Sequence, residues 1–199
     1  MEAVGCYLAS DSEKQQLKES LWNAETGALN REIVAQPAAT IAEIAGIDLP
    51  DNKTFFLVEE HGIGPDHPFS GEKLSVVAAL YKWDTFEQAI DLVNRITAYS
   101  GPGHSCGLHS NDDDRIRLLG TKANVSRVMI RQPQCLANSG AWTNGMPMSL
   151  TLGCGSWGGN STSSNVTWEH LLNYTWVSTP IPAKQPSDEE LFGAAMHEE

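Results

Sequence analysis

The sequence has little positive charge for its 199 residues. Its 13 Lys and Arg residues are outnumbered by 25 Asp and Glu residues, and the net charge is −12. Nucleic-acid binding depends on clustered basic side chains, so this balance argues against a nucleic-acid partner. Long apolar runs are also missing, because no run approaches the roughly 18 residues of a membrane-spanning helix. We therefore expect neither nucleic acid nor a membrane as a partner.

Cysteine is scarce and scattered. The cysteines are Cys6, Cys106, Cys135 and Cys154, and none forms a CxxC pair or a zinc-finger spacing with histidine. The sequence therefore predicts no metal site. The first residues, "MEAVGCYLAS", lack the basic and long apolar regions of a secretory signal. We expect a cytoplasmic location with reduced thiols.

Patterns typical of helices and of strands alternate along a chain of globular composition, with 41% hydrophobic and 19% charged residues. Helices are predicted over 12–22, 37–46, 85–99 and 112–123, and strands over 32–34, 54–60, 74–83, 104–110, 127–132 and 174–179. Asp84 with Glu87 is typical of a capping box before the third helix. The alternation predicts an α/β domain with a largely parallel sheet flanked by helices, followed by an acidic tail.

The stretch "LTLGCGSWGGNSTSSN" (150–165) holds four glycines within seven residues, 153–159. Such density is useful only where the backbone turns sharply or approaches another group closely. Cys154 stands between two of these glycines, where a thiol has little steric shielding, yet no charged base is near it in sequence. It is either a reactive thiol or a bystander. The stretch does not match GxGxxG between a strand and a helix, so the dinucleotide-binding fingerprint is absent.

A second candidate region is "GPGHSCGLHS" (101–110). The Gly-Pro-Gly turn presents His104 at the start of a strand, and alternation places Cys106 on the same side and His109 on the other. A Cys/His nucleophile pair is geometrically possible here. A histidine without a functional role is the competing interpretation.

Charged residues on two other strands are also candidates. "RVMIRQ" places Arg127, Met129 and Arg131 on one face, where arginine serves either an ion pair or the binding of an anionic ligand. Glu72 precedes the 74–83 strand and is either a solvated loop charge or a cofactor ligand. The residue patterns alone do not decide between these alternatives.

Three segments resemble a known family: "GEKLSVVAALYK", "GPGHSCGLHS" and "MPMSLTLGCGSWGGNSTSSNV…HLLN". In this order they resemble the C-terminal half of the CoA-acylating aldehyde dehydrogenases, from about Gly5 to about Ile181. The resemblance implies an aldehyde-dehydrogenase-like catalytic domain over 1–173, an oligomerisation strand over 174–182 and an acidic tail over 183–199. It also implies NAD or NADP as cofactor, CoA as co-substrate, and a homo-oligomer.

In this family a cysteine thiolate attacks the aldehyde, hydride passes to the nicotinamide, and the thiol of CoA then accepts the acyl group. The resemblance implies that this cysteine and the nucleotide-binding domain belong to a segment before Gly5. Cys154 matches the family's glycine-loop cysteine instead, which makes it a bystander. His104 matches the histidine of the family's "GHTS"-like motif, as a polar partner of the oxyanion or of CoA.

Other roles carry over by position. Glu72 and Leu74 match the first and third positions of the superfamily's "E-x-F-G-P" motif, which holds the nicotinamide ribose, although Val76 stands where members often have Pro. Gly153, Gly155 and Trp157 belong to the loop expected to close over the aldehyde.

Arg131 is the candidate residue for recognition of the substrate. It replaces a small amide in the "RILINTPAS" of ethanol-type members, whereas Arg127 is shared with them and is expected to be structural. "RQPQ…TNGMPM" also resembles the succinate-semialdehyde and sulfoacetaldehyde branch, so Arg131 is expected to bind the anionic end of a short aldehyde. Pairing of Arg131 with an acidic side chain is the alternative.

Two functions from different classes remain open. The chain is either part of an acylating oxidoreductase, or an inactive fragment or interaction module without nucleophile and nucleotide-binding domain. In both cases we expect the isolated chain to lack dehydrogenase turnover and to self-associate through 174–179, whose strand edge would lack its partner.

Overall fold

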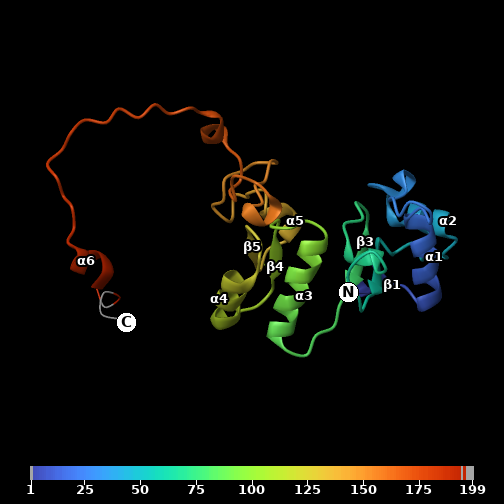
Figure 1. The fold of residues 1–199 in the computed structure, drawn as a ribbon. Coiled ribbons are helices and arrows are strands. Elements are labelled where there is room, and N and C mark those ends of the chain that lie inside the picture. The colour runs from blue at the N-terminus through green and yellow to red at the C-terminus, as the bar shows by residue number, and fades with distance from the viewer. Residues whose placement is uncertain (1, 194, 196–199) are drawn as a thin grey trace. The chain divides into compact units, whose positions relative to one another are not determined.

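The computed structural model describes residues 2–193 and 195 (Figure 1). Its internal contacts divide the chain into two units, Met1–Thr167 and Trp168–Glu199. The first unit contains helices α1 (Asp11–Leu21), α2 (Ala38–Ala45), α3 (Phe86–Tyr99), α4 (Asp113–Lys122) and α5 (Gln134–Ala137). Its strands are β1 (Cys6–Leu8), β2 (Phe55–Glu59), β3 (Val77–Leu80), β4 (Cys106–Leu108) and β5 (Val128–Ile130). Single 3-10 turns lie at Glu2–Val4, Arg31–Ile33, Pro68–Ser70 and Ser156–Gly158.

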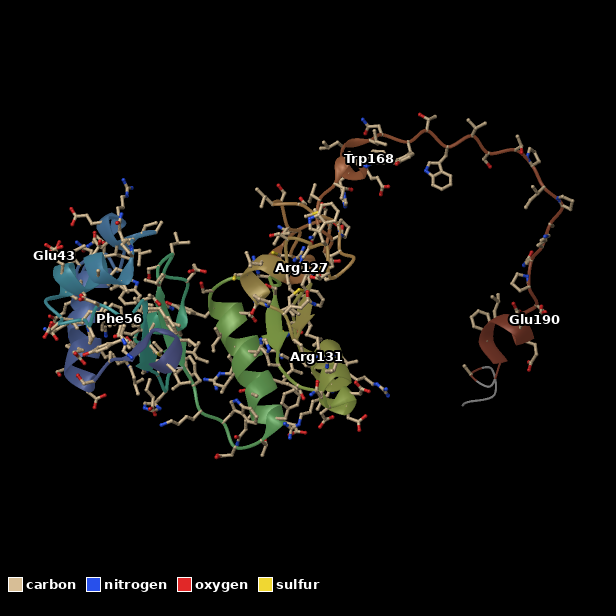
Figure 2. The ribbon with its side chains drawn as sticks, turned by 180° about the vertical axis from the view of Figure 1, so that it is seen from behind. Glu43, Phe56, Arg127, Arg131, Trp168 and Glu190 are labelled. Atoms are coloured by element: carbon tan, nitrogen blue, oxygen red, sulfur yellow. The ribbon has the colours of Figure 1, made fainter. Side chains whose placement is uncertain are left out.

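β1, β2 and β3 form one parallel sheet, in that order. The apolar run of β2 supplies Phe56, labelled in Figure 2, and Val58 to a core. The same core contains Leu17 and Leu21 from α1 and Ile41 from α2. All five side chains are fully buried. A parallel strand covered by helices needs such a continuous apolar sequence.

β4 and β5 form a second, two-stranded parallel sheet, with Cys106 opposite Val128. Ile90 from α3 and Leu119 from α4 pack with Cys106 and Val125 in its core. The fold is therefore the predicted α/β arrangement with parallel strands and helices, and its strands lie in two sheets.

Local details differ from the sequence predictions. The predicted strand 32–34 is wrong, because Asn30 accepts a hydrogen bond from the Glu32 amide and starts a 3-10 turn that buries Ile33. The capping box before α3 uses Thr85 and Gln88 instead of Asp84 and Glu87. Both residues of this capping box lie one position after the predicted ones, since neighbouring polar residues compete for the same cap.

The second unit holds a 3-10 turn at Trp168–Leu171 and the short helix α6 (Asp188–Phe192). The predicted strand 174–179 is not assigned as a strand, because it has no paired neighbour among the described residues, and pairing is what completes a strand. Tyr174, Trp176 and Val177 are exposed there. Across the described residues, no helix combines the length and the apolar character needed to cross a membrane.

Candidate functional site

The glycine loop packs against the Gly-Pro-Gly turn that carries His104. Gly103 has φ +76°, and a Cβ there would stand 2.0 Å from the Cys154 carbonyl oxygen. On the facing side, a Cβ at Gly158 would stand 2.7 Å from the Pro102 carbonyl oxygen. Real Cβ atoms do not approach backbone so closely, so both positions require glycine. The glycine density of 153–159 thus serves backbone contact between the two loops.

The buried guanidinium of Arg127 forms hydrogen bonds to both loops, and we call this set of contacts the Arg127 clamp. Arg127 is only 4% exposed, and its Nε donates to Oδ1 of the equally buried Asn165 at 2.7 Å. Its Nη2 donates to the Gly153 carbonyl at 2.7 Å and to the Ser163 carbonyl at 3.3 Å, while Nη1 donates to the His104 carbonyl at 3.3 Å. The planar fork of arginine suits several acceptors at once. The prediction that Arg127 is structural agrees with these contacts.

The same arginine remains a cation in spite of its burial. Burial lowers the pKa of the Arg127 guanidinium from its ordinary value, and nearby Cys154 opposes this change. Guanidinium titrates far above neutral pH, so the charge persists and strengthens each of its hydrogen bonds. Figure 2 shows Arg127 and Arg131, the two arginines of "RVMIRQ", in this part of the chain.

His104 is exposed above this clamp, and its ring is held by its neighbour in sequence. Nδ1 of His104 lies 2.7 Å from Oγ of Ser105, a buried residue directly before β4. Ser105 in turn contacts the side-chain amides of Gln134 and Asn138. Among the described residues no hydrogen bond joins His104 to Cys106, so the predicted possibility of a nucleophile pair finds no support.

The cysteines of this region differ in their surroundings. Burial raises the pKa of the Cys106 thiol to about 11, which keeps it protonated at neutral pH. Cys154 is half-buried, and its Sγ lies 3.9 Å from the Leu152 carbonyl oxygen. No group of His, Cys, Asp and Glu side chains suited to a metal ion occurs in the part of the chain that the structure describes.

Glu72 and Leu74 form a separate turn before β3. Oε1 of Glu72 accepts hydrogen bonds from the backbone amides of Lys73 and Leu74, both at 2.8 Å. Leu74 has φ 47° and is 58% exposed, whereas Lys73 is buried and donates to the carbonyls of Phe69 and Gly71. No hydrogen bond within the described residues links this turn to His104.

Arg131 does not share the strand face of Arg127. β5 ends at Ile130, and Arg131 adopts φ 52°, so the alternation that places Arg127 and Met129 on one buried face stops before it. The predicted common face is wrong for this reason. Arg131 is exposed, and its Nη1 donates to the Ser110 carbonyl at 2.8 Å. Its side chain is therefore anchored at one nitrogen beside the end of β4.

The other loop residues are brought together by the fold. A Cβ on Gly155 would stand 3.2 Å from the indole of Trp157, and Trp157 itself is half exposed. Gly153, whose carbonyl accepts from Arg127, and Gly155 are both buried, so Trp157 is the exposed member of the three. Sequence reasoning missed Ser105, Asn138 and Asn165 altogether. Ser105 carried one signal, as a polar residue directly before an apolar strand, whereas Asn138 and Asn165 carried none.

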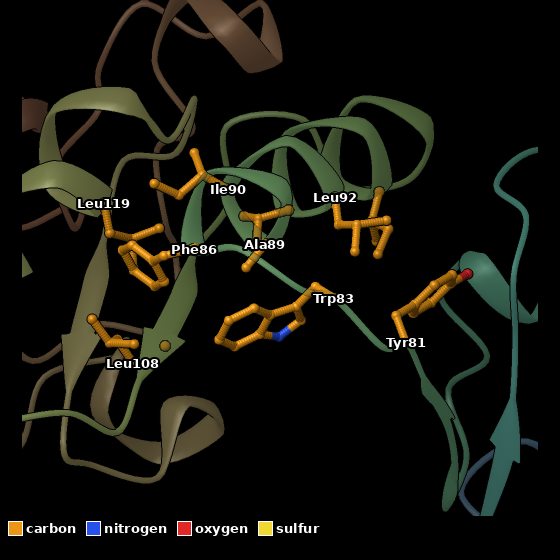
Figure 3. Close-up of a pocket in the computed structure, with 11 residues that line it drawn as sticks. Tyr81, Trp83, Phe86, Ala89, Ile90, Leu92, Leu108 and Leu119 are labelled. Atoms are coloured by element: carbon orange, nitrogen blue, oxygen red, sulfur yellow. The ribbon is translucent and has the colours of Figure 1, made fainter. Parts of the chain in front are cut away.

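An apolar groove of ≈ 270 Å³ lies elsewhere, along α3 and β4 (Figure 3). It is lined by Tyr81, Trp83, Phe86, Ala89, Ile90, Leu92, Val93, Ile96, Gly107, Leu108 and Leu119. Tyr81 is its single titratable lining residue, and burial and nearby Glu60 raise the pKa of its phenol to about 12. The groove therefore offers no acid, base or nucleophile near neutral pH.

Comparison with known proteins identifies relatives of the chain, although no protein-family model matches it. It is 42% identical over 198 residues to a sulfoacetaldehyde dehydrogenase of Acholeplasma sp, covering 98% of this chain and 41% of that protein. It is 35% identical over 191 residues to a succinate-semialdehyde dehydrogenase (acetylating) of Clostridium kluyveri, covering 95% and 42%. The crystal structure of a probable aldehyde dehydrogenase from Listeria monocytogenes EGD-e matches with TM-score 0.86 and 33% identity, covering 96% and 41%.

The parallel α/β fold with its glycine loop is thus the fold of the matching part of an aldehyde dehydrogenase. Within that class, the chain is homologous to the acylating aldehyde dehydrogenases, as its motifs predicted. It spans about two fifths of the length of the relatives that it matches.

Proposed function

We propose that the chain is the C-terminal part of a CoA-acylating aldehyde dehydrogenase that uses NAD or NADP and converts a short anionic aldehyde, sulfoacetaldehyde or succinate semialdehyde, to its acyl-CoA. The observation that carries the proposal is the Arg127 clamp, which joins the glycine loop to the His104 turn. Arg127 thus connects two motifs of the family, which are 49 residues apart between His104 and Gly153. The names of the relatives support the substrate class.

On this surface His104 is the polar partner of the reacting oxygen. Its ring is exposed while its Nδ1 side is fixed by Ser105, which leaves Nε2 available to a ligand. A hydrogen-bond donor aimed at an oxygen that gains negative charge stabilises the transition state more than the substrate. Exposed Trp157 would form the wall beside it, and the buried Gly153 and Gly155 would support this wall from within the loop.

The turn at Glu72 and Leu74 fits the ribose of a nicotinamide cofactor. A carboxylate has about four acceptor positions, and the amides of Lys73 and Leu74 use two at Oε1. The exposed carboxylate therefore retains acceptors for two ribose hydroxyls in a fixed orientation. When bound, the nicotinamide would accept hydride. Glu72 would hold the ribose, and Leu74 would contact the same group with its exposed side chain.

Arg131 is the residue that we propose for substrate choice. Its Nη1 is held by the Ser110 carbonyl, so the guanidinium is oriented, exposed and charged. A sulfonate or carboxylate would then receive charge-assisted hydrogen bonds from the remaining donors. Acetaldehyde offers no such group, so Arg131 would favour anionic aldehydes.

The assembly belongs to the same proposal. Residues 1–173 would contribute the catalytic portion, 174–182 a strand for a neighbouring subunit of a cytoplasmic homo-oligomer, and 183–199 an acidic tail. The exposed Tyr174, Trp176 and Val177 support a role for 174–182 in association, since such a patch is costly in water. An inactive fragment or an interaction module is the alternative, and the following assay separates the two.

The test is a fusion of this chain behind the preceding portion of the Acholeplasma sulfoacetaldehyde dehydrogenase, which replaces the homologous part of that protein. We expect NAD(P)H formation that requires CoA, with sulfoacetaldehyde or succinate semialdehyde preferred over acetaldehyde. The intact Acholeplasma protein is the matched control. A folded fusion without activity, beside an active control, would support the interaction module.

A further inference from the structure

The hydroxyl of Ser105 connects His104 to two side-chain amides. Ser105 is 7% exposed, and its Oγ lies 2.7 Å from Nδ1 of His104. Nε2 of Gln134, in α5, donates to this Oγ at 3.0 Å, and Nδ2 of Asn138 donates to it at 3.4 Å. Three groups thus converge on one hydroxyl, and the direction of each hydrogen bond can be worked out from its neighbours.

The two amides act as donors. Nε2 of Gln134 also lies 2.9 Å from the Ser105 carbonyl oxygen, and a carbonyl only accepts, so the NH₂ end of Gln134 faces Ser105. For Asn138, Nδ2 is the end that points to Ser105 Oγ, and Oδ1 accepts a hydrogen bond from Ser139 Oγ at 3.2 Å. Asn138 is buried, and its backbone carbonyl receives Nδ2 of Asn165 at 3.0 Å, so its position is tied to the Arg127 clamp.

A serine hydroxyl has two lone pairs and one hydrogen. Both lone pairs of Ser105 are used by Gln134 and Asn138, so its hydrogen is directed to Nδ1 of His104. A neutral imidazole that accepts at Nδ1 carries its hydrogen at Nε2. We infer that Ser105 is a positioning residue that sets the Nε2–H tautomer of His104, so that the exposed side of the ring presents a hydrogen-bond donor.

This inference rests on the proposed function for its catalytic meaning, because a donor at Nε2 is the form of His104 that stabilises a reacting oxygen. The other tautomer would turn a lone pair toward that oxygen and repel it. Ser105 and Gln134 thereby join the site through His104, although neither contacts the aldehyde. The tautomer itself is a property of this chain alone and is measurable without activity.

The test is two-bond ¹H–¹⁵N NMR of the chain with ¹⁵N-labelled histidine, at a pH where the imidazoles are neutral. We expect His104 to show an unprotonated Nδ1 and a protonated Nε2. Ser105→Ala removes the partner of Nδ1 and is expected to give a mixture of tautomers, while Ser105→Thr keeps the hydroxyl and restores one tautomer. Gln134→Glu substitutes an acceptor for a donor and takes the serine hydrogen, so it is expected to move the histidine hydrogen to Nδ1.

A protonated Nδ1 in the wild-type chain overturns the inference, as does a tautomer that neither Ser105→Ala nor Gln134→Glu changes. Backbone amide shifts outside the site show whether each variant has kept its fold, and if Ser105→Ala has not, the pair Ser105→Thr and Gln134→Glu decides. In the fusion protein, kcat of Ser105→Ala is expected to fall about tenfold or more and to recover with Ser105→Thr, because a wrong histidine tautomer in a catalytic triad costs up to ~10⁴. An inactive wild-type fusion would contradict the proposed function and leave the NMR result on Ser105 standing.

Discussion

The Nε atom of Arg127 and the Oδ1 atom of Asn165, 38 residues apart in the chain, are joined by a buried hydrogen bond of 2.7 Å. The guanidinium also donates hydrogen bonds to the carbonyls of Gly153, Ser163 and His104. These hydrogen bonds attach the glycine loop to Arg127, directly before β5, and to the His104 turn. This arrangement, within the described residues, determines where the candidate catalytic surface stands.

Replacement of the clamp arginine should loosen the loop. Arg127→Lys keeps the charge but cannot reach Asn165, Gly153 and Ser163 together, and a loss of about 2–3 kcal/mol in the free energy of unfolding is expected from the buried acceptors left unpaired. Urea unfolding followed by tryptophan fluorescence measures this loss. Arg95→Lys, at an exposed ion pair on α3, is the control and should change stability by less than about 0.5 kcal/mol. Equal losses of stability in the two variants would show that the hydrogen bonds of Arg127 do not stabilise the loop.

The close approach of the two loops can be tested at a single glycine. Gly103→Ala is expected to cost about 1–2 kcal/mol for its left-handed backbone and about 1–3 kcal/mol more for the clash with the Cys154 carbonyl. Gly145 has φ +67° and open space around it, so Gly145→Ala should lose only the first amount. The difference between the two variants in thermal or urea unfolding isolates the packing of the loops. If both lose the same stability, the loops do not touch as described.

The raised pKa of Cys106 predicts a pH-dependent reactivity. The thiolate is the reactive form, so a thiol with a pKa of about 11 should resist iodoacetamide at about pH 8 and become reactive as the pH approaches 11. Exposed Cys135 serves as the internal control and should be alkylated at the lower pH. Peptide mapping by mass spectrometry distinguishes the two sites. Modification of Cys106 as fast as Cys135 at about pH 8 would reopen its candidacy as a nucleophile.

Substrate choice can be tested at Arg131 in the fusion protein. Arg131→Asn should raise KM for sulfoacetaldehyde or succinate semialdehyde by an amount equivalent to roughly 1.5–3 kcal/mol of charged hydrogen bonding. Acetaldehyde, which has no anionic end, should be almost unaffected. Steady-state kinetics with both kinds of aldehyde makes the comparison within one protein. An equal loss for both would show that Arg131 acts through the Ser110 carbonyl as a structural residue.

Most of the fold could be predicted because its signals are local. The apolar run of β2 and the 3.6-residue periodicity of α3 each lie within one segment, and the structure has both elements within one or two residues of their expected bounds. The strand prediction for 32–34 was wrong because three residues are too few to establish a strand periodicity. The cap at Asn30 starts a 3-10 turn there instead. The predicted common face of Arg127 and Arg131 was wrong because side chains alternate only within a strand, and β5 ends before Arg131.

The clamp and the Ser105 network could not be predicted from sequence. Arg127 meets Asn165, and Ser105 meets Gln134 and Asn138, across separations of about thirty residues or more. Such contacts leave no periodic trace, because a single polar residue in a loop looks the same whether it is solvated or buried. Even the glycines of 153–159 revealed only that something approaches the backbone, and the Gly-Pro-Gly turn was identified as that partner by the structure.

The proposed function assigns to this chain the glycine loop and the histidine of an acylating aldehyde dehydrogenase, and it requires a further segment for turnover. The most direct measurement is acyl-CoA formation, followed by mass spectrometry, for the isolated 199-residue chain and for the fusion under the same conditions. The account predicts acyl-CoA from the fusion and none from the isolated chain, because proximity of the thiolate and the cofactor is worth about 7–11 kcal/mol. CoA-dependent turnover by the isolated chain, lost on Cys106→Ser or Cys154→Ser, would contradict it.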